Sequence, residues 1–438
     1  MAKRTLGLII AAPSSGIGKT VLTLGLVAAL RRRGYVVAVA KAGPDYIDPQ
    51  FLSAAAGFSC INLDSWAMSA CELRTRVVKH ASEADILIIE GAMGLFDGPN
   101  DGVGSTADLA EILALPVILA VDASRQAQSI AAIVHGFTTF RMNPKICGVI
   151  TTKVASDRHA DMVFKSLLEL NICNLGAFRL DKALKLQSRH LGLVQAHEFY
   201  TLEEIVKTAG INAETHLNLD RLVALAGPIA SEKPWKTAEQ VIPPLGQHIA
   251  VAHDSAFSFT YPHILSDWRA QGAQISLFSP LKNEAASTEA DAIFLPGGYP
   301  ELYAGKLSDS NVFLDSIRQA AKRDTLIYGE CGGYMVLGQS LIDSTGKAYR
   351  MSGLLSHVTS FYNPKLNIGY RTLKNAGYAW QLPKCFLGHE FHYSYLTNVG
   401  SDLPLFYASD SSGCSLGDFG GYRNNVMGSY AHVISTNH

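Results

Sequence analysis

The chain has 438 residues, more than one hydrophobic core usually accommodates, so the length predicts two domains. Apolar residues make up 48% and charged residues 17% of the sequence, a balance that is typical of globular proteins and excludes a disordered chain. The formal net charge of -1 gives no electrostatic reason to expect nucleic acid or a membrane surface as a partner.

The seven cysteines are scattered and include no C-x-x-C pair, so neither a zinc cage nor a disulfide framework is indicated. Reduced thiols and a cytoplasmic location are the expectation. The apolar run at 6–12 follows two basic residues and mimics a signal peptide, but it leads directly into a phosphate-loop-like motif and is predicted as a first strand. No apolar run is long enough to span a bilayer.

Apolar runs alternate with helix-like stretches through the first half of the chain. This alternation predicts crossover units and a parallel α/β sheet. Strands are expected at 6–12, 36–41, 85–90, 116–122 and 146–152, and helices at 20–33 and 124–140.

Residues 12–20 read APSSGIGKT between the first strand and a helix, which is the setting of a phosphate loop. The glycines would let backbone N–H groups face an anion, the lysine would reach the β- and γ-phosphates, and the threonine hydroxyl would bind Mg²⁺. The first glycine of the usual pattern is replaced by Pro13, and a simple glycine turn with a surface lysine is the alternative. The predicted ATP-binding residues are Ser14, Ser15, Gly16, Gly18, Lys19 and Thr20.

Two acidic loops follow the second and third expected strands, KAGPDYIDP at 41–49 and EGAMGLFDG at 90–98. Ligands bind at the carboxyl edge of a parallel sheet, so these loops are candidates for metal and substrate contacts. Each aspartate could instead be a turn former or a helix cap. The predicted metal ligands are Thr20, Asp45 and Glu90, and the candidates for either substrate or metal are Lys41, Asp48 and Asp97.

The alternation weakens after about residue 220, and residues 227–246 combine prolines with polar residues, as linkers do. Strand-like runs return at 248–253, 274–279, 291–295 and 325–329. The predicted organisation is a first domain at 1–226, a linker at 227–246 and a second α/β domain at 247–438.

Residues 325–334 read TLIYGECGGY, in which a strand leads into a cysteine, two glycines and a helical pattern. This is a nucleophile elbow in thiol form. We expect the turn to expose the sulfur of Cys331 at a helix N-terminus, which favours the thiolate, and Gly332 and Gly333 to give a substrate carbonyl access. A buried cysteine beside a tight turn is the alternative.

A thiol nucleophile needs a base, and His432, His389 and His392 are the candidates. Triad glutaminases carry a glutamate two residues after the base, but Ile434 stands there after His432, so a Cys–His dyad is predicted. The turn PGGYPE at 296–301 could supply an oxyanion hole from Gly297 and Gly298, although a plain glycine turn would read the same.

Together these motifs resemble the family of cobyrinic acid and hydrogenobyrinic acid a,c-diamide synthases. The resemblance covers nearly the whole chain in order. Its motifs are APSSGIGKT, KAGPDYIDP, EGAMGLFDG, RHLGLVQAHE, LPGGYPEL, GECGGY and GHEFHYS.

The resemblance implies a first domain similar to dethiobiotin synthetase and a class-I-like cysteine glutaminase domain of the cobyric-acid-synthase type. In that glutaminase type the nucleophile aligns with Cys331 and the base with His432. The type also lacks the acidic residue of the catalytic triad, which is consistent with Ile434 at the corresponding position. Thr152-Lys153 replaces the family's usual asparagine–arginine pair, which puts contacts from that loop in doubt. The stretch at 122–129 resembles the branch of the family that acts on the metal-free ring.

The implied activity is amidation of the a and c acetate carboxylates of a corrin ring in cobalamin biosynthesis, with ATP and glutamine as co-substrates, Mg²⁺ as cofactor and acyl phosphates as intermediates. A homodimer without nucleic-acid or membrane partners is expected. The alternatives are a cobyric acid synthase or another tetrapyrrole amidotransferase, a dethiobiotin-synthetase-like carboxylase with an inactive second domain, and a partitioning-type ATPase switch. Such switches carry a second lysine where this chain has Pro13 and Ser14.

Overall fold

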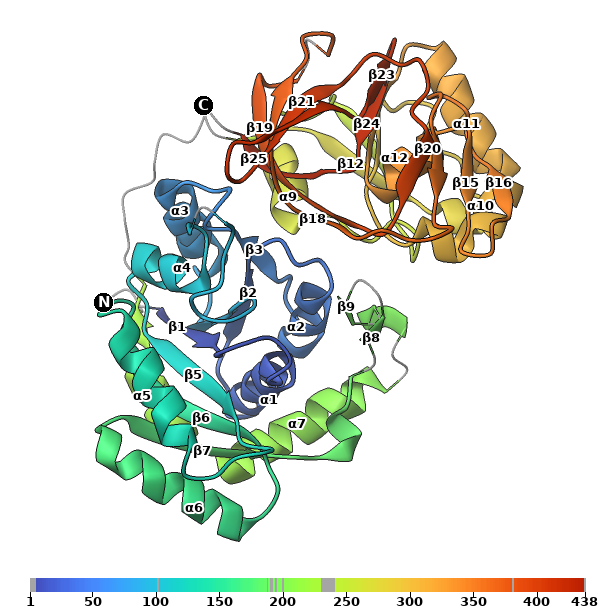
Figure 1. Cartoon of the computed structure of the whole chain (residues 1–438). Coiled ribbons are helices and arrows are strands. Elements are labelled where there is room, and N and C mark those ends of the chain that lie inside the picture. The colour runs from blue at the N-terminus through green and yellow to red at the C-terminus, as the bar shows by residue number, and fades with distance from the viewer. Residues whose placement is uncertain are drawn as a thin grey trace. The chain divides into compact units, whose positions relative to one another are not determined.

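The computed structural model divides into two compact units, Met1–Thr237 and Ala238–His438 (Figure 1). It describes residues 5–100, 102–186, 188–189, 192–193, 195–198, 201–229, 241–379 and 382–436. Over these residues no helix combines the length and the apolarity that crossing a bilayer requires.

The first unit is built on one twisted sheet with the strand order β3-β2-β4-β1-β5-β6-β7. Neighbouring strands along this path are parallel, and β10 adds to β1 in antiparallel pairing. The strands are β1 (Leu6–Ala11), β2 (Val37–Ala42), β3 (Ile61–Leu63), β4 (Ile86–Glu90), β5 (Val117–Asp122), β6 (Ile146–Val154), β7 (Cys173–Arg179) and β10 (Gly227–Pro228).

Helices cover both faces of this sheet, as parallel strands require (Figure 1). Helix α1 packs against both α2 and α7. Helix α3 packs against α4, and α5 packs against α6. The elements are α1 (Lys19–Arg32), α2 (Asp48–Ala56), α3 (Ala70–His80), α4 (Thr106–Leu113), α5 (Ile130–Phe140), α6 (Asp157–Leu167), η1 (Leu168–Leu170), η2 (Lys182–Leu184), η3 (Ala196–Glu198), α7 (Leu202–His216), α8 (Leu219–Leu225) and the ribbon of β8 (Ser188–Arg189) and β9 (Gly192–Leu193).

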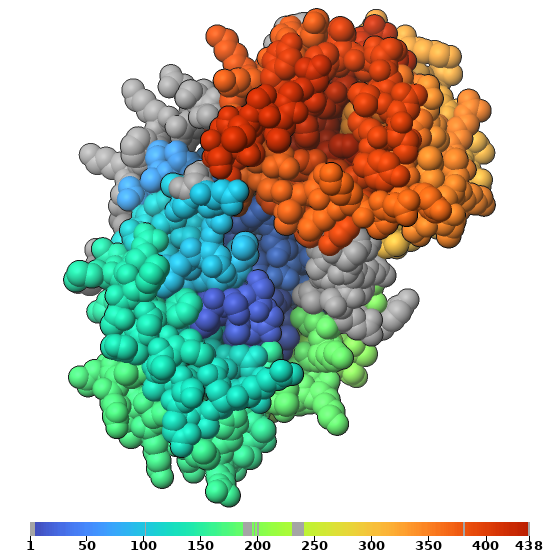
Figure 2. All heavy atoms as spheres, in the orientation of Figure 1, coloured from blue at the N-terminus to red at the C-terminus, as the bar shows by residue number. Residues whose placement is uncertain are grey.

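The central strands are apolar on both faces because helices cover both. In β1 the sequence LGLIIA is buried from its second residue onward, and β4 is buried throughout. Figure 2 shows only a small dark-blue area of the N-terminal segment between the light-blue and green atoms of the same unit. The first strand is therefore core, which confirms the strand interpretation of the apolar run at 6–12.

Two elements differ from the sequence-based expectation. The helix expected at 124–140 begins only at Ile130, because Asp122 accepts a hydrogen bond from the backbone N–H of Ser124 (2.7 Å) and a loop follows the strand. The expected linker at 227–246 opens with β10, whose Gly227 and Pro228 pair with β1, so these two residues belong to the sheet of the first unit. Residues 230–240 lie outside the described part of the chain.

The second unit contains a mainly parallel sheet with the order β12-β11-β13-β14-β24-β23, in which only the β23–β24 pair is antiparallel. The expected strands at 248–253, 274–279, 291–295 and 325–329 all fall in it. Its elements are β11 (His248–Ala252), α9 (Pro262–Ala270), β12 (Gln274–Phe278), η5 (Pro280–Lys282), β13 (Ala292–Leu295), η6 (Pro300–Tyr303), α10 (Ala304–Asp309), α11 (Asn311–Lys322), β14 (Leu326–Glu330), α12 (Gly332–Leu337), β23 (Gly421–Arg423) and β24 (Val426–Ser429).

The rest of the second unit is largely antiparallel, which the sequence pattern had not indicated. One sheet has the order β16-β15-β17-β20 and the other has the order β22-β21-β18-β19-β25. Their strands are β15 (Ser340–Ile342), β16 (Ala348–Arg350), β17 (Val358–Ser360), β18 (Asn367–Asn375), β19 (Cys385–His392), β20 (Tyr395–Asn398), β21 (Phe406–Asp410), β22 (Ser415–Phe419) and β25 (His432–Thr436).

Candidate active sites

The segment between β1 and α1 is a tight loop whose conformation depends on glycine. Gly16 and Gly18 have φ angles of 77° and 95°, in the left-handed region that glycine adopts without steric cost. Helix α1 begins at Lys19, directly after Gly18, so its positive end lies at the loop. Ser14 and Ser15 are exposed on the loop, and the Ser14 hydroxyl donates to the carbonyl of Ser15 (3.3 Å).

The Lys19 side chain is buried and joins two loops. Its Nζ donates to the carbonyl of Ser14 (3.2 Å) and to that of Met93, in the acidic loop after β4. Burial, with a further contribution from Lys41, lowers the pKa of Lys19 to about 8. A phosphate would replace these neutral carbonyl partners with a stronger, charged one.

Behind the phosphate loop lies a buried cluster of opposite charges. The Thr20 hydroxyl donates to Oε1 of Glu90 (2.9 Å) and lies 3.4 Å from Oδ2 of Asp48. The Lys41 ammonium donates to the same two oxygens, at 2.7 Å and 2.5 Å. Burial alone would lower the pKa of Lys41, but Asp48 and Glu90 outweigh it and raise this pKa well above its usual value. A cation therefore already sits between the two carboxylates.

Asp45 and Asp48 have different positions, although the sequence offered both as candidates for metal binding. Oδ1 of Asp45 accepts from the backbone N–H groups of Ile47 (2.8 Å) and Asp48 (3.0 Å), so Asp45 shapes the turn that starts α2. Asp48 is the aspartate whose carboxylate contacts Thr20 and Glu90, whereas Asp45 lies 3.9 Å from the Lys41 ammonium. The metal ligand that we had expected at position 45 is better assigned to position 48.

Asp97 is a loop former rather than a member of that cluster. Its Oδ2 accepts from the backbone N–H of Gly94 (3.0 Å), which closes the turn of the acidic loop at 90–98. That turn holds Met93 beside Lys19, so Asp97 acts on the phosphate site through the backbone.

The Thr152-Lys153 pair does contact the phosphate loop, although it departs from the family pattern. The Thr152 hydroxyl donates to the carbonyl of Ile17 (2.8 Å), and Nζ of Lys153 donates to the carbonyl of Gly16 (2.7 Å) and to Asp122 (2.7 Å). These two side chains of β6 therefore support the phosphate loop, although their contact with a ligand stays a prediction.

The cluster fits a magnesium ion bound together with a nucleotide. Oε2 of Glu90 is fully buried and has no hydrogen-bond partner among the described residues. The same residues contain no cluster of three or more His, Cys, Asp or Glu side chains arranged as a metal cage. A site of two carboxylates, one hydroxyl, phosphate oxygens and water suits Mg²⁺, which seldom uses an all-protein cage.

In the second unit, Cys331 occupies the turn between β14 and α12. Its φ and ψ of 46° and −105° lie outside the regions that non-glycine residues normally adopt, as is typical of a nucleophile elbow. The Cys331 backbone N–H donates to the carbonyl of Ser429 (2.8 Å) at the end of β24, which ties the elbow to the neighbouring strand.

Gly297 lies between the candidate nucleophile and the candidate base. A Cβ atom at Gly297 would collide with the imidazole of His432 and would lie 3.2 Å from Cβ of Cys331. The two side chains therefore flank the same glycine, which confirms that sequence positions about a hundred residues apart meet. The next amide, of Gly298, lies 3.1 Å from where a Cβ of Gly332 would be, so the PGGYPE turn borders the elbow as an oxyanion hole requires.

The thiol environment differs from the expected exposed thiolate. Cys331 is only 1% exposed, and burial, with Glu301, Glu390 and Glu330 adding negative charge, raises the pKa of its thiol well above the usual range. The resting nucleophile is a neutral thiol. A Cβ at Gly333 would overlap the carbonyl of Leu295, so this glycine serves the close approach of α12 to β13 rather than substrate access.

The three candidate histidines have different settings. His432 and His389 face each other in the β19–β25 ladder, and burial lowers the pKa of each to about 3. His392 is instead engaged with Glu390 (2.7 Å), which also accepts from Arg371 (2.7 Å), and its ring stacks on Tyr430 at 4.1 Å. His432 is thus the base candidate beside Cys331, and His392 belongs to a buried ion-pair network.

A carboxylate that we had not singled out lies next to His432. Oε2 of Glu330, the residue before the nucleophile, is 3.9 Å from Nδ1 of His432. The only feature in the sequence that could have pointed to Glu330 was its position as a single glutamate at the end of an apolar strand. Its proximity to His432 depends on how β14 and β25 meet in space, which the sequence does not display.

Comparison with known proteins assigns each of the two units to a domain family. Residues 8–194 match the model of the CobQ/CobB/MinD/ParA nucleotide binding domain, and residues 248–438 match that of the CobB/CobQ-like glutamine amidotransferase domain. Over 433 residues the chain is 49% identical to a hydrogenobyrinate a,c-diamide synthase of Brucella anthropi, covering 98% of each chain. It is 46% identical over 428 residues to one of Rhizobium meliloti, covering 98% of this chain and 99% of the relative.

The matched regions span both the phosphate loop and the thiol elbow. The chain belongs to the hydrogenobyrinate a,c-diamide synthase family.

Proposed function

We propose that this chain uses ATP and glutamine to convert the a and c acetate carboxylates of hydrogenobyrinic acid into amides, as a step of cobalamin biosynthesis. The observation that carries the proposal is the Cys331 elbow beside His432 and Gly297, in a chain that also holds a glycine loop with Lys19 and Thr20. A glutaminase and a nucleotide site in one chain are what an amide-forming ligase requires.

The first unit would activate the carboxylate. A carboxylate is a poor electrophile, so its oxygen takes the γ-phosphoryl group of ATP, which gives an acyl phosphate and ADP. We assign Gly16, Gly18 and the start of α1 to phosphate binding, with Ser14 and Ser15 contributing loop groups. Lys19, which donates only to neutral carbonyls in this structure, is placed to neutralise charge on the transferred group.

We propose that Thr20, Asp48 and Glu90 hold Mg²⁺, which when bound supplies charge neutralisation at the phosphate oxygens. The unpartnered Oε2 of Glu90 supports this assignment. Lys41 pairs with both carboxylates in this structure, so it would give up part of that contact when the metal is held. A lysine freed there would contact the anionic carboxylate substrate, in line with its place among the substrate candidates.

The second unit would supply ammonia. The sulfur of Cys331 attacks the side-chain carbonyl carbon of glutamine, and the thiol proton passes to His432 and then to the departing nitrogen. The predicted oxyanion-hole residues, Gly297 and Gly298, border the elbow at Cys331 and Gly332, where their amides would face the oxyanion of the tetrahedral intermediate. Water hydrolyses the resulting thioester to glutamate, and the ammonia displaces phosphate from the acyl phosphate in the other site.

The metal-free ring is the proposed substrate because the relatives described above carry the name hydrogenobyrinate. The test is to incubate the purified chain with ATP and glutamine and with either hydrogenobyrinic or cobyrinic acid, and to measure product masses. The proposal predicts conversion of exactly two carboxylates and preference for the metal-free ring. Four amidations would instead indicate a cobyric acid synthase.

Two finer assignments stay predictions. The domain division at 1–226, 227–246 and 247–438 is testable by limited proteolysis, and a homodimer is testable by light scattering of the purified chain.

A further inference from the structure

The glutaminase site lacks a triad acid at position 434, and Glu330 is a carboxylate that lies near His432. In triads of this kind a carboxylate faces the second ring nitrogen of the histidine, holds its tautomer and stabilises the imidazolium. Ile434 removes that carboxylate from the usual position, two residues after His432. If His432 is the base, another group near its Nδ1 is needed to orient the ring.

Glu330 lies at that nitrogen. Its Oε2 is 3.9 Å from Nδ1 of His432, whereas the Nε2 side of the ring lies against Gly297 and toward Cys331. The other oxygen, Oε1, accepts from the Tyr328 hydroxyl (3.1 Å) and from the backbone N–H of Val433 (3.1 Å). These two bonds fix the carboxyl group from β14 and β25, so its free oxygen is aimed at the histidine.

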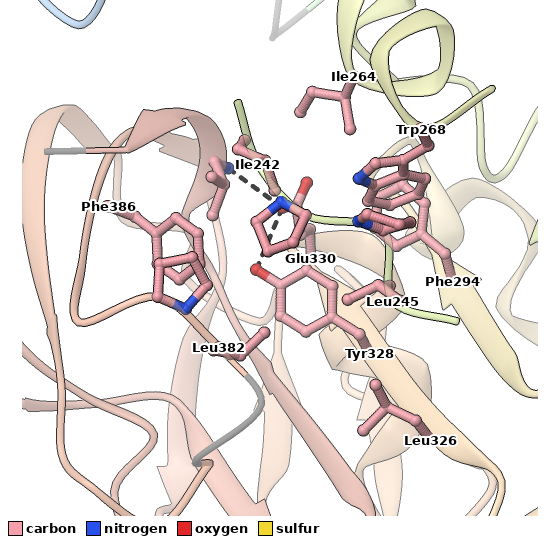
Figure 3. Close-up of a pocket in the computed structure, with 14 residues that line it drawn as sticks. Ile242, Leu245, Ile264, Trp268, Phe294, Leu326, Tyr328, Glu330, Leu382 and Phe386 are labelled. Carbon is pink, nitrogen blue, oxygen red and sulfur yellow. Dashed lines mark hydrogen bonds between the residues drawn. The ribbon is translucent and has the colours of Figure 1, made fainter. Parts of the chain in front are cut away.

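The surroundings of Glu330 are otherwise apolar. The carboxyl group lies in the wall of a cavity of about 40 Å³ in the second unit (Figure 3). The cavity lining consists, besides Glu330 and Tyr328, of apolar side chains from the segment at 242–245, α9, β13, β14, β19, β25 and the residues before β19. Among the described residues, the titratable groups that face this carboxyl are Tyr328, His432 and the adjacent Cys331, with His389 and His392 close to the His432 ring.

We propose that Glu330 is the positioning residue of His432, an acid supplied from the strand before the nucleophile in place of the one absent at position 434. The inference rests on the proposed glutaminase function. As sulfur attacks, the thiol proton moves to Nε2 of His432, and the Nδ1–H of the resulting imidazolium faces the ionised Glu330. The proton leaves Nε2 for the departing ammonia, and Glu330 keeps its charge throughout.

This role gives the reaction a pH signature. Burial raises the pKa of Glu330 to about 8, although the bonds from Val433 and Tyr328 act against the rise. The form with an ionised Glu330 and a neutral His432 therefore grows as pH rises through 8, and glutamine hydrolysis should rise with it. If Glu330 only joined β14 to β25 through its hydrogen bond with Val433, glutamine hydrolysis would not show this rise with pH.

The experiment measures glutamine hydrolysis by Glu330→Gln across pH 6 to 9, with ammonia-dependent ligation by the same protein as the internal control. We expect kcat for glutamine to fall by roughly 10²-fold or more, KM to change little, and the rising limb to disappear, because an amide cannot stabilise the imidazolium. Ammonia-dependent ligation should persist. Tyr328→Phe, which removes one hydrogen bond from the same carboxyl group, should lower kcat by less than about threefold.

Wild-type kcat with an unchanged pH profile in Glu330→Gln would overturn the proposal, as would a parallel loss of both activities with a lowered melting temperature in Glu330→Gln and Glu330→Asp. If only Glu330→Gln fails to fold, Glu330→Asp decides, since loss of glutaminase with retained ammonia-dependent ligation supports positioning and full glutaminase contradicts it. A parent chain that hydrolyses no glutamine at all would refute the proposed function instead.

Discussion

The two candidate sites handle charge in opposite ways. In the first unit Lys41, Asp48 and Glu90 form a buried ionic cluster whose members are paired before any ligand binds. In the second unit burial keeps Cys331 protonated and His432 unprotonated, so the nucleophile and its base are neutral at rest. The first site is organised to exchange one cation for another, whereas in the second the nucleophile and its base become charged only during the reaction.

This difference follows from what each site binds. A nucleotide brings several negative charges, so a preassembled set of cations and carboxylates needs little rearrangement to receive it. Glutamine brings a neutral amide, and a permanent thiolate in a buried site would carry a large desolvation cost. The comparison predicts that substitutions will separate the two half-reactions.

The largest expected effect comes from removing the thiol. Cys331→Ser should lose glutamine-dependent amidation by roughly 10³-fold or more, since a hydroxyl beside His432 is a far weaker nucleophile. Amidation with a high concentration of an ammonium salt at raised pH should remain, because ammonia attacks the acyl phosphate directly. Rates with both nitrogen sources test this, and equal rates for mutant and parent with glutamine would make Cys331 a packing residue.

Lys19→Ala should affect the other half-reaction. Ligation should fall by roughly 10²-fold or more with either nitrogen source, because the γ-phosphate loses its cation, while glutamine hydrolysis continues. Lys153→Met, which removes a different cation that contacts the phosphate loop from β6, is the matched control and should have the smaller effect. ADP release and glutamate release are measured in parallel. Unchanged ligation by Lys19→Ala would contradict this prediction.

A smaller effect distinguishes the two aspartates of the first unit. Asp48→Asn should raise the Mg²⁺ concentration needed for half-maximal ligation by about tenfold, because one of two carboxylate ligands loses its charge. Asp45→Asn should change that requirement less, since its backbone hydrogen bonds survive in the amide. Magnesium titrations of both variants decide the matter, and the reverse order would restore Asp45 as the ligand.

The weakest effect is on the pH dependence of stability in the second unit. Burial lowers the pKa of His357 to about 4 and that of both His389 and His432 to about 3, so unfolding takes up protons below about pH 6.5 and stability falls as pH decreases. The raised pKa of Glu330, about 8, acts with the opposite sign, so its contribution is full below about pH 4.5 and is lost as pH rises toward 8.

From these four groups the melting temperature should be highest near pH 6.5 and lower by several degrees at pH 5.5. Glu330→Gln should flatten the alkaline side and make the acid side steeper, because the Glu330 contribution already declines from about pH 4.5. Calorimetry at a series of pH values measures both limbs, and an alkaline limb that is unchanged in this variant would show that Glu330 is ionised in the folded chain.

Much of this organisation was predictable because it is local. The glycine loop before Lys19 and the strand–cysteine–helix turn at Cys331 are contiguous motifs, and the structure has both in the predicted settings. The distinction between Asp45 and Asp48 was not predictable, because it depends on which carboxylate the turn directs inward. The approach of Glu330 to His432 was not predictable either, because it joins β14 to β25 across the fold.

The buried state of Cys331 illustrates the same limit. A helix N-terminus suggested a stabilised thiolate, but α12 has only six residues and the surrounding loops leave the sulfur with almost no solvent. Desolvation then outweighs the helix end. The sequence pattern did not indicate the antiparallel strands of the second unit, two of which, β19 and β25, carry His389, His392 and His432.

The most direct test of the account follows the nitrogen atom. The parent chain and Cys331→Ser are each given ATP, hydrogenobyrinic acid and glutamine labelled with ¹⁵N in the side-chain amide, together with unlabelled ammonium. The account predicts labelled amides in the parent product and unlabelled amides in the product of Cys331→Ser. Labelled product from Cys331→Ser, or no ligation by this variant at any ammonium concentration while it remains folded, would contradict it.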